Sequence, residues 1–274
     1  MNAHEQFQKE VSANIDGIAR DLDLQALSRR WILETSKHRY SYNFEYMGRP
    51  IIQYPQDMVA IQELIWRVKP DVVIETGIAH GGSLVMNASM LAMLDYCDAI
   101  RSHQLLDPSH AGRRVIGVDI DIRSHNRSAI ESHPLSHRIS MIQGSSIAPD
   151  VISQVRNAVS AHERVLVCLD SNHTQEHVLA ELDAYAPLVS PDSYCVIFDT
   201  IIEQMPDSLY ADRPWKRGNS PMSAVDRFMS SLETKHVSAI DGSRLCFEID
   251  SRMDSKLLIS VAPRGFLRRI HAAT

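Results

Sequence analysis

Short apolar runs rich in β-branched residues alternate with stretches of helical period from residue 72 onward. Strands that are apolar on both faces and alternate with helices are typical of a parallel sheet covered on both sides. The pattern therefore predicts a doubly wound, mostly parallel α/β fold. The predicted strands are 72–74, 115–118, 139–142, 165–169 and 194–198, and the helices between them are 84–94, 148–161 and 175–188.

The two ends of the chain depart from this alternation. A helical period covers residues 3–35, and a loop rich in aromatic residues follows at 40–46. Proline is frequent in the first turn of a helix, so Pro55 predicts the start of another helix. The other predicted elements are helices over 57–68 and 223–232 and strands around 245–247 and 257–261. We therefore predict an N-terminal helical extension with an aromatic loop over 1–50 and the main domain over 51–274.

Composition and charge exclude several classes of protein. The 274 residues are 44% hydrophobic and 23% charged, which is ordinary for a globular protein. The formal net charge of -6 disfavours a nucleic-acid partner, because such a protein needs a basic face to displace counterions from phosphates. No apolar run approaches the roughly 20 residues of a membrane helix, and no secretory signal is visible. Four scattered cysteines without a CxxC pair predict a reducing, cytoplasmic location.

Four carboxylates lie where predicted strands end: Glu75, Asp119, Asp170 and Asp199. In a doubly wound sheet the carboxyl ends of the strands line one crevice, and ligands bind there. Acids gathered at that edge repel one another unless a cation or ligand hydroxyls neutralise them. The sequence therefore predicts a binding site for a positively charged ligand at this edge of the sheet.

The first of these strand ends continues into a glycine-rich turn, residues 75–83. Glycines permit a tight turn and close approach of the backbone to a ligand. The spacing differs from the GxGxxG of dinucleotide enzymes, which disfavours a nicotinamide oxidoreductase. Glu75 instead suits the charged amino-acid end of S-adenosylmethionine, and Asp119 can accept hydrogen bonds from ribose hydroxyls. The alternative is a turn whose glycines serve packing only.

Asp170 and His173 are separated by two residues across a strand-to-helix turn, so both can face one crevice. Imidazole is the usual general base near neutral pH, which makes His173 a candidate for removing a hydroxyl proton. Asp170 and Asp199 together offer carboxylate oxygens of the kind that Mg²⁺ accepts. The alternatives are a histidine bonded to backbone at a helix start and an aspartate that caps a turn.

At these residues the chain resembles the family known as cephalosporin hydroxylases, whose members are similar to metal-dependent sugar and macrolide O-methyltransferases. The resemblance covers most of the chain, from about residue 35 to residue 269. The matching stretches are 40–44, 48–53, 74–83, Asp170-Ser171-Asn172-His173-Thr174 with His177, Asp199-Thr200, and Arg213-Pro214-Trp215 with Gly218-Asn219.

The resemblance implies a seven-stranded, Rossmann-like methyltransferase sheet with a reversed last strand, S-adenosylmethionine as methyl donor, and Mg²⁺. The implied acceptor is a hydroxyl of a small molecule, by analogy a sugar, a glycosylated natural product or a polysaccharide. Asp170 and Asp199 would bind the metal, and His173 with Asp170 would act in catalysis. The implied cofactor residues are Glu75, Gly77, Ala79, Gly81, Ser83, Asp119, Ile120, Ser145 and Asp170, and the implied acceptor residues are Tyr42, His80, Thr200 and Trp215.

One position departs from the family's pattern, because Phe198 stands where members commonly carry glutamate before Asp199. The metal is then bound with one more water, weakly or not at all, unless Glu203 compensates. Two rival functions stay open: a non-haem iron hydroxylase that uses His173, His177 and Asp170, and a non-catalytic member that only binds a ligand or partner. We also expect a homo-oligomer and a lid over the acceptor at 210–220.

Overall fold

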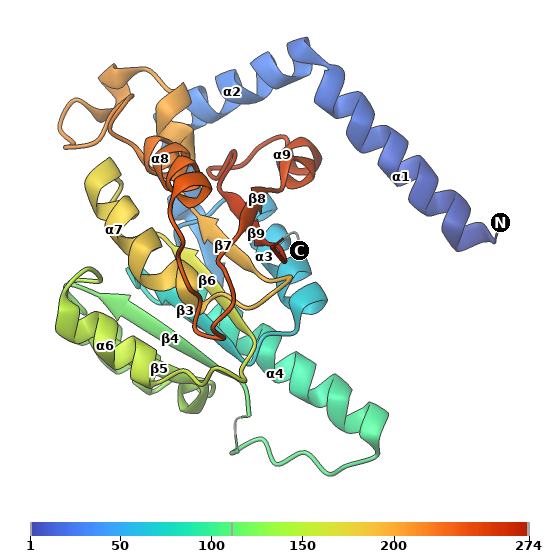
Figure 1. Ribbon diagram of the computed structural model, residues 1–274, viewed down its shortest axis with the longest axis vertical. Helices are drawn as coiled ribbons and strands as arrows, with labels where there is room; N and C mark the ends of the chain where they lie inside the picture. The colour runs from blue at the N-terminus through green and yellow to red at the C-terminus, as the bar shows by residue number, and fades with distance from the viewer. Residues whose placement is uncertain (1, 111, 273–274) are drawn as a thin grey trace.

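A seven-stranded sheet forms the centre of the molecule (Figure 1). This computed structural model describes residues 2–110 and 112–272. The strands of this sheet are β3 (Val72–Thr76), β4 (Arg114–Asp119), β5 (Ile139–Gln143), β6 (Val165–Leu169), β7 (Tyr194–Ile197), β8 (Phe247–Ile249) and β9 (Phe266–Arg269). Their order is β5-β4-β3-β6-β7-β9-β8. Strands β3 to β7 are parallel, and β9 runs antiparallel to both β7 and β8. The predicted doubly wound sheet with a reversed last strand is confirmed.

Hydrophobic clusters cover both faces of the sheet. Successive side chains of a strand point to opposite faces, so Val72 and Ile74 of β3 belong to one cluster and Val73 to the other. Figure 1 shows α6 and α7 on one side of the sheet and α3 and α4 on the other. The helices that cover the sheet are α3 (Pro55–Val68), α4 (Gly82–Ser102), α5 (Ser124–Glu131), α6 (Pro149–Asn157), α7 (Gln175–Tyr185), α8 (Pro221–Thr234) and α9 (Ser251–Leu257).

The N-terminal segment differs from the single helix predicted over 3–35. It forms two helices, α1 (Ala3–Arg20) and α2 (Leu22–Ser36), because Asp21 ends the first and caps the second. The Asp21 carboxylate accepts a hydrogen bond of 2.9 Å from the Leu24 amide, which satisfies a free donor of the new helix. The aromatic segment is also more ordered than a loop and forms η1 (Tyr40–Asn43), β1 (Phe44–Tyr46) and β2 (Arg49–Ile51). The predicted domain boundary at residue 50 falls within β2, and the division into two units stays a prediction.

The predicted strand around 257–261 is wrong. Helix α9 ends at Leu257, and Leu258 adopts a positive φ of 59°, which turns the chain out of an extended path. The Val261 amide and the Ser260 hydroxyl then donate to the buried Asp57 carboxylate instead of to a neighbouring strand. The other predicted C-terminal strand, around 245–247, is confirmed as β8, two residues later. Short 3-10 helices η2 (Ser136–Arg138), η3 (Ala186–Leu188), η4 (Thr200–Gln204) and η5 (Asp207–Tyr210) complete the fold.

None of the described helices combines the length and the apolar character that a membrane crossing demands. Within the described residues the four cysteines are free thiols.

Candidate active site

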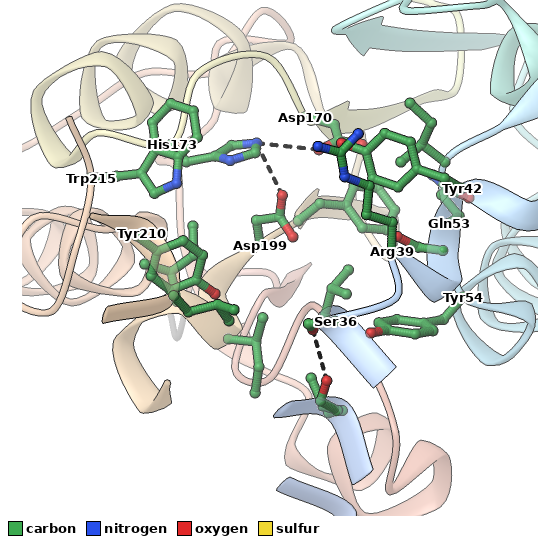
Figure 2. A pocket seen from close by; sticks show the side chains of 18 of the residues that line it. Ser36, Arg39, Tyr42, Gln53, Tyr54, Asp170, His173, Asp199, Tyr210 and Trp215 are labelled. Atoms are coloured by element: carbon green, nitrogen blue, oxygen red, sulfur yellow. Dashed lines mark hydrogen bonds and ion pairs between the residues drawn. The ribbon is translucent and has the colours of Figure 1, made fainter. Parts of the chain in front are cut away.

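Two adjoining cavities open at the carboxyl ends of the central strands. The first, of about 280 Å³, we call the aromatic cavity; it is drawn in Figure 2. The second, of about 240 Å³, we call the glycine-loop cavity, because residues 77–80 line it. The aromatic rings around the first cavity are Tyr42, Tyr54, Phe198, Tyr210 and Trp215. The residues common to both cavities are Tyr42, Ile52, Gln53, Asp170, His173 and Asp199.

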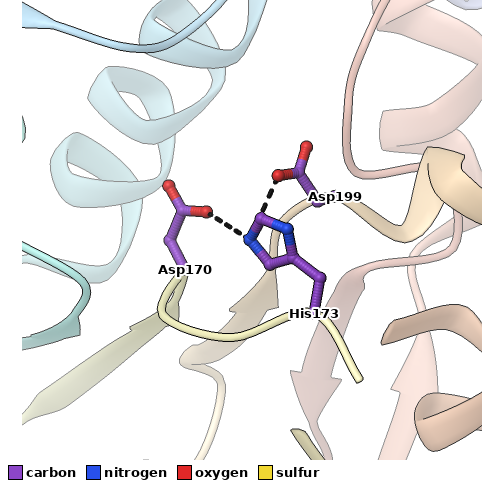
Figure 3. Close-up of side chains that lie close together, drawn as sticks. All are labelled: Asp170, His173 and Asp199. Carbon is purple, nitrogen blue, oxygen red and sulfur yellow. Dashed lines mark ion pairs between the residues drawn. The ribbon is translucent and has the colours of Figure 1, made fainter. Parts of the chain in front are cut away.

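Asp170, His173 and Asp199 meet where the two cavities join (Figure 3). The His173 Nε2 atom lies 3.1 Å from Asp199 Oδ2 and 3.6 Å from Asp170 Oδ1. The imidazole also packs at a tilt against the Trp215 ring, with 4.8 Å between the ring centroids. The three side chains that the sequence singled out as base and metal ligands are thus brought together.

The register of the sheet places these residues at one level. Thr76 at the end of β3 pairs with Leu169 at the end of β6, so Asp170 is the first residue beyond the sheet. The Asp170 amide donates to the Thr76 carbonyl at 2.9 Å, which fixes the start of the turn. Asp199 has a positive φ of 56°, an unfavourable conformation for a residue with a side chain. Such backbone strain is frequent at functional sites.

The carboxylates and the imidazole change one another's affinity for protons. Burial raises the pKa of Asp170 to about 7, although the neighbouring His173 imidazole works in the opposite direction. Burial lowers the pKa of His173, but the negative charges of Asp199 and Asp170 outweigh it, so the pKa of His173 lies above its ordinary value. His173 therefore takes up a proton more readily than an isolated imidazole does, as a general base requires.

The glycine-rich turn is held against β4 and β6. Gly77 has a φ of +91°, and a Cβ at this position would collide with the Asp170 carbonyl. One Asp119 carboxylate oxygen accepts from the amides of Ile78 at 2.8 Å and Ala79 at 3.2 Å. Gly77, Ala79, Ser83 and Asp119, which were predicted for the cofactor, line the glycine-loop cavity together with His80, which was predicted for the acceptor.

Three predicted site residues lie elsewhere. Glu75 is only 3% exposed and accepts hydrogen bonds from Ser83 Oγ and Asn87 Nδ2 beneath α4, so it lines neither cavity. Gly81 is buried against the Ile130 side chain. Thr200 is fully buried and its hydroxyl donates to the Pro263 carbonyl at 2.6 Å, which takes it away from an acceptor.

The burial of Glu75 can be tested by measuring how the unfolding free energy depends on pH. Burial raises the pKa of Glu75 to about 8. The folded protein then keeps a proton that the unfolded chain has lost, so stability falls as the pH rises between about 4.5 and 8. We expect Glu75→Gln, which copies the protonated side chain, to make unfolding free energy less dependent on pH, by on the order of a few kcal/mol. Urea unfolding of both proteins at both ends of this range measures the change, and parallel pH profiles would refute it.

A third, smaller cavity of about 150 Å³ adjoins Gly77 and Asp119. Its lining includes two residues predicted for the cofactor, Ser145 and Ile120. His177 also lines it, with Nε2 3.0 Å from Ser146 Oγ and 3.2 Å from Ser171 Oγ. His177 is thus bonded to hydroxyls outside the Asp170 cluster, and the iron ligand set of the hydroxylase alternative is not assembled.

The cluster has donor atoms that suit a divalent cation. One ligand atom each from Asp170, His173 and Asp199 lies within 4.8 Å of the others. Carboxylate oxygens are the ligands that Mg²⁺ prefers. Burial raises the pKa of Asp170 because it disfavours the charged carboxylate, and a bound cation would stabilise that charged form. Phe198 is 2% exposed and offers no ligand atom. Glu203 cannot replace it, because its carboxylate accepts from the Gly218 amide and the Ser220 hydroxyl.

Comparison with known proteins places the chain in a family. The family model of rhamnosyl O-methyltransferase/CmcI matches residues 38–270. The chain belongs to this family. Membership confirms the predicted resemblance and the predicted enzyme class, an O-methyltransferase.

The curated relatives and solved structures that match the chain have low sequence identity to it. The rhamnosyl O-methyltransferase of Mycobacterium tuberculosis (strain H37Rv) is 25% identical over 229 residues, which are 82% of this chain and 77% of that protein. A CmcI structure with Mg and SAM has a TM-score of 0.49 at 14% identity and covers 84% of this chain and 77% of its own. An O-methyltransferase of Bacillus cereus in complex with SAH has a TM-score of 0.49 at 13% identity, over 94% of this chain and 90% of its own.

Sequence reasoning missed several residues of the aromatic cavity. Arg39, Gln53 and Tyr54 line it without a role assigned from the sequence, whereas Tyr210 belongs to the predicted lid. Gln53 is the last residue of a stretch that matches the family, 48–53, and this match was the sequence signal that could have identified it as a site residue.

Proposed function

We propose that this protein transfers the methyl group of S-adenosylmethionine to a hydroxyl of a sugar or of a glycosylated small molecule. The observation that carries the proposal is the imidazole of His173, held between two aspartates where two ligand-sized cavities meet. The family and the names of its curated rhamnosyl relatives support a sugar acceptor. A homo-oligomer and a cytoplasmic location stay predictions.

The glycine-loop cavity suits the donor. S-adenosylmethionine supplies an already activated methyl group, so the protein must chiefly align the two reactants. Gly77, Ala79 and Ser83 would contact the donor from the turn, and Asp119 would accept from its ribose. Asp170 and Asp199 carry the negative charge that favours a sulfonium at the junction. Ser145 and Ile120 would bind the adenine in the third cavity.

The aromatic cavity suits a sugar. Aromatic rings cover the apolar faces of a ligand, while a few polar groups fix its orientation. Tyr42 and Trp215 are the two predicted acceptor residues that line it, and Trp215 comes from the predicted lid. The His173 imidazole would accept the proton of the acceptor hydroxyl while the hydroxyl oxygen attacks the methyl carbon of S-adenosylmethionine and the carbon–sulfur bond breaks. A divalent cation bound by Asp170 and Asp199 would polarise the same hydroxyl.

Transfer of labelled methyl from S-adenosylmethionine to a panel of rhamnosides and nucleotide sugars tests the proposal. We expect saturable donor binding by calorimetry and a labelled ether product. Treatment with EDTA should lower turnover if the cation participates, and readdition of Mg²⁺ should restore it. Donor binding without transfer to any panel member would favour the non-catalytic alternative, and dependence on 2-oxoglutarate would favour the hydroxylase.

A further inference from the structure

Gln53 lies in the wall that the two cavities share, and its amide oxygen is buried without a partner among the described residues. The residue follows β2, is 6% exposed and lines both the aromatic and the glycine-loop cavities. Figure 2 shows its side chain beside Tyr54, on the same wall as Tyr42. Among the described residues, its buried Oε1 atom accepts no hydrogen bond.

A buried amide oxygen without a partner destabilises a folded protein, by about 1–3 kcal/mol. Such groups are rare in native structures and require an explanation, for which a missing ligand is one. The adjoining backbone is well fixed, because the Tyr54 ring stacks on Tyr40 with centroids 5.7 Å apart and contacts Trp31 at 5.8 Å. The chain next to Gln53 is therefore held in place by the packing of Tyr54.

A second buried glutamine near Gln53 serves as a comparison. Gln56, in the first turn of α3, also has a buried Oε1 that accepts no hydrogen bond within the described chain. However, Gln56 lines neither cavity. Two glutamines three residues apart thus share the same unsatisfied group, and of the two only Gln53 lines the cavities.

We propose that Gln53 binds the acceptor sugar through a hydroxyl next to the one that is methylated. This inference rests on the proposed function. A glutamine side chain has one donor and one acceptor side by side, so it can accept from one hydroxyl of a vicinal diol and donate to the next. The glycine-loop cavity has Ser83 and Asp119 for the donor, whereas Gln53 is the one carboxamide among the described residues that line the aromatic cavity.

The test compares Gln53→Met with Gln56→Met, because methionine keeps the length of the side chain and removes the amide. The probes are p-nitrophenyl α-L-rhamnoside and its three monodeoxy derivatives. For the wild type we expect one derivative to give no product, because it lacks the reacting hydroxyl, and a second to lose at least about tenfold in kcat/KM. Gln53→Met should show a similar loss of kcat/KM on the parent rhamnoside, caused by a higher KM. Its kcat/KM values for the parent rhamnoside and for the second derivative should be equal.

Stability and donor binding separate this role from a structural one. Both variants should unfold at the same temperature as the wild type or higher, because each removes an unsatisfied buried group. Their affinities for S-adenosylmethionine should equal that of the wild type.

The inference is overturned if Gln53→Met still discriminates between the derivatives, if it weakens donor binding instead, or if Gln56→Met behaves alike. A wild-type protein that binds the donor but methylates no sugar of the panel refutes the proposed function itself, and the inference with it.

Discussion

Replacing His173 with alanine is expected to lower the methyl-transfer rate by about 10²–10⁴-fold, the usual contribution of a general base. The affinity for S-adenosylmethionine should change little, because the glycine-rich turn and Asp119 stay in place. The physical reason is that His173 brings a basic nitrogen to the junction of the cavities, within 3.1 Å of Asp199 and 3.6 Å of Asp170. Single-turnover rates at saturating donor and calorimetric donor binding measure the two effects.

The pH profile identifies the group. The raised pKa of His173 means that its neutral, proton-accepting form predominates only above its ordinary pKa of 6.5. The rate of the wild type should therefore rise with pH through that region, and the rise should be absent from His173→Ala. His177→Ala is the control for the pH profile, because it removes an imidazole that is bonded to Ser146 and Ser171 instead of to the aspartates. His177 lines the third cavity, so donor affinity can fall in this variant while the rise of the rate with pH persists. Unchanged turnover in His173→Ala would refute its role as base.

The order and direction of the strands could be predicted because local patterns determine them. Runs such as 165–169 are short and apolar throughout, which is typical of a strand covered on both faces. The polar residue after each parallel strand then lies at one edge of the sheet, and this brings Asp170 and Asp199 to the same crevice. The position of His173 follows from the same argument, since it is four residues beyond the end of β6.

The directions of individual side chains could not be predicted as well. Strand β3 continues one residue beyond Glu75, to Thr76, so Glu75 lies within the sheet and not at its end. The two-residue alternation then gives Glu75 the same face as Val73, beneath α4. Thr200 and the Asp57–Ser260 contact depend on how the C-terminal segment folds back, a contact of high sequence separation that no local pattern contains.

Replacing Gly77 with alanine is expected to have the largest effect on the fold of the site. Its φ of +91° disfavours any side chain, and a Cβ would collide with the carbonyl carbon and oxygen of Asp170. These are backbone atoms, so no rotamer change relieves the clash. We expect a loss of more than about 4 kcal/mol in unfolding free energy, which is exceptional for one substitution, and a loss of donor affinity of about 10²-fold or more in any folded fraction.

Gly48→Ala is the control that separates the clash from the strained backbone. Gly48 also has a positive φ, +81°, but a Cβ there would meet nothing within 4 Å. Its replacement should therefore cost only the conformational penalty of about 1–2 kcal/mol. Urea unfolding at 25 °C with calorimetric donor binding measures both variants. Equal losses in the two would show that φ alone matters, and that the contact between the glycine-rich turn and Asp170 does not shape the donor site.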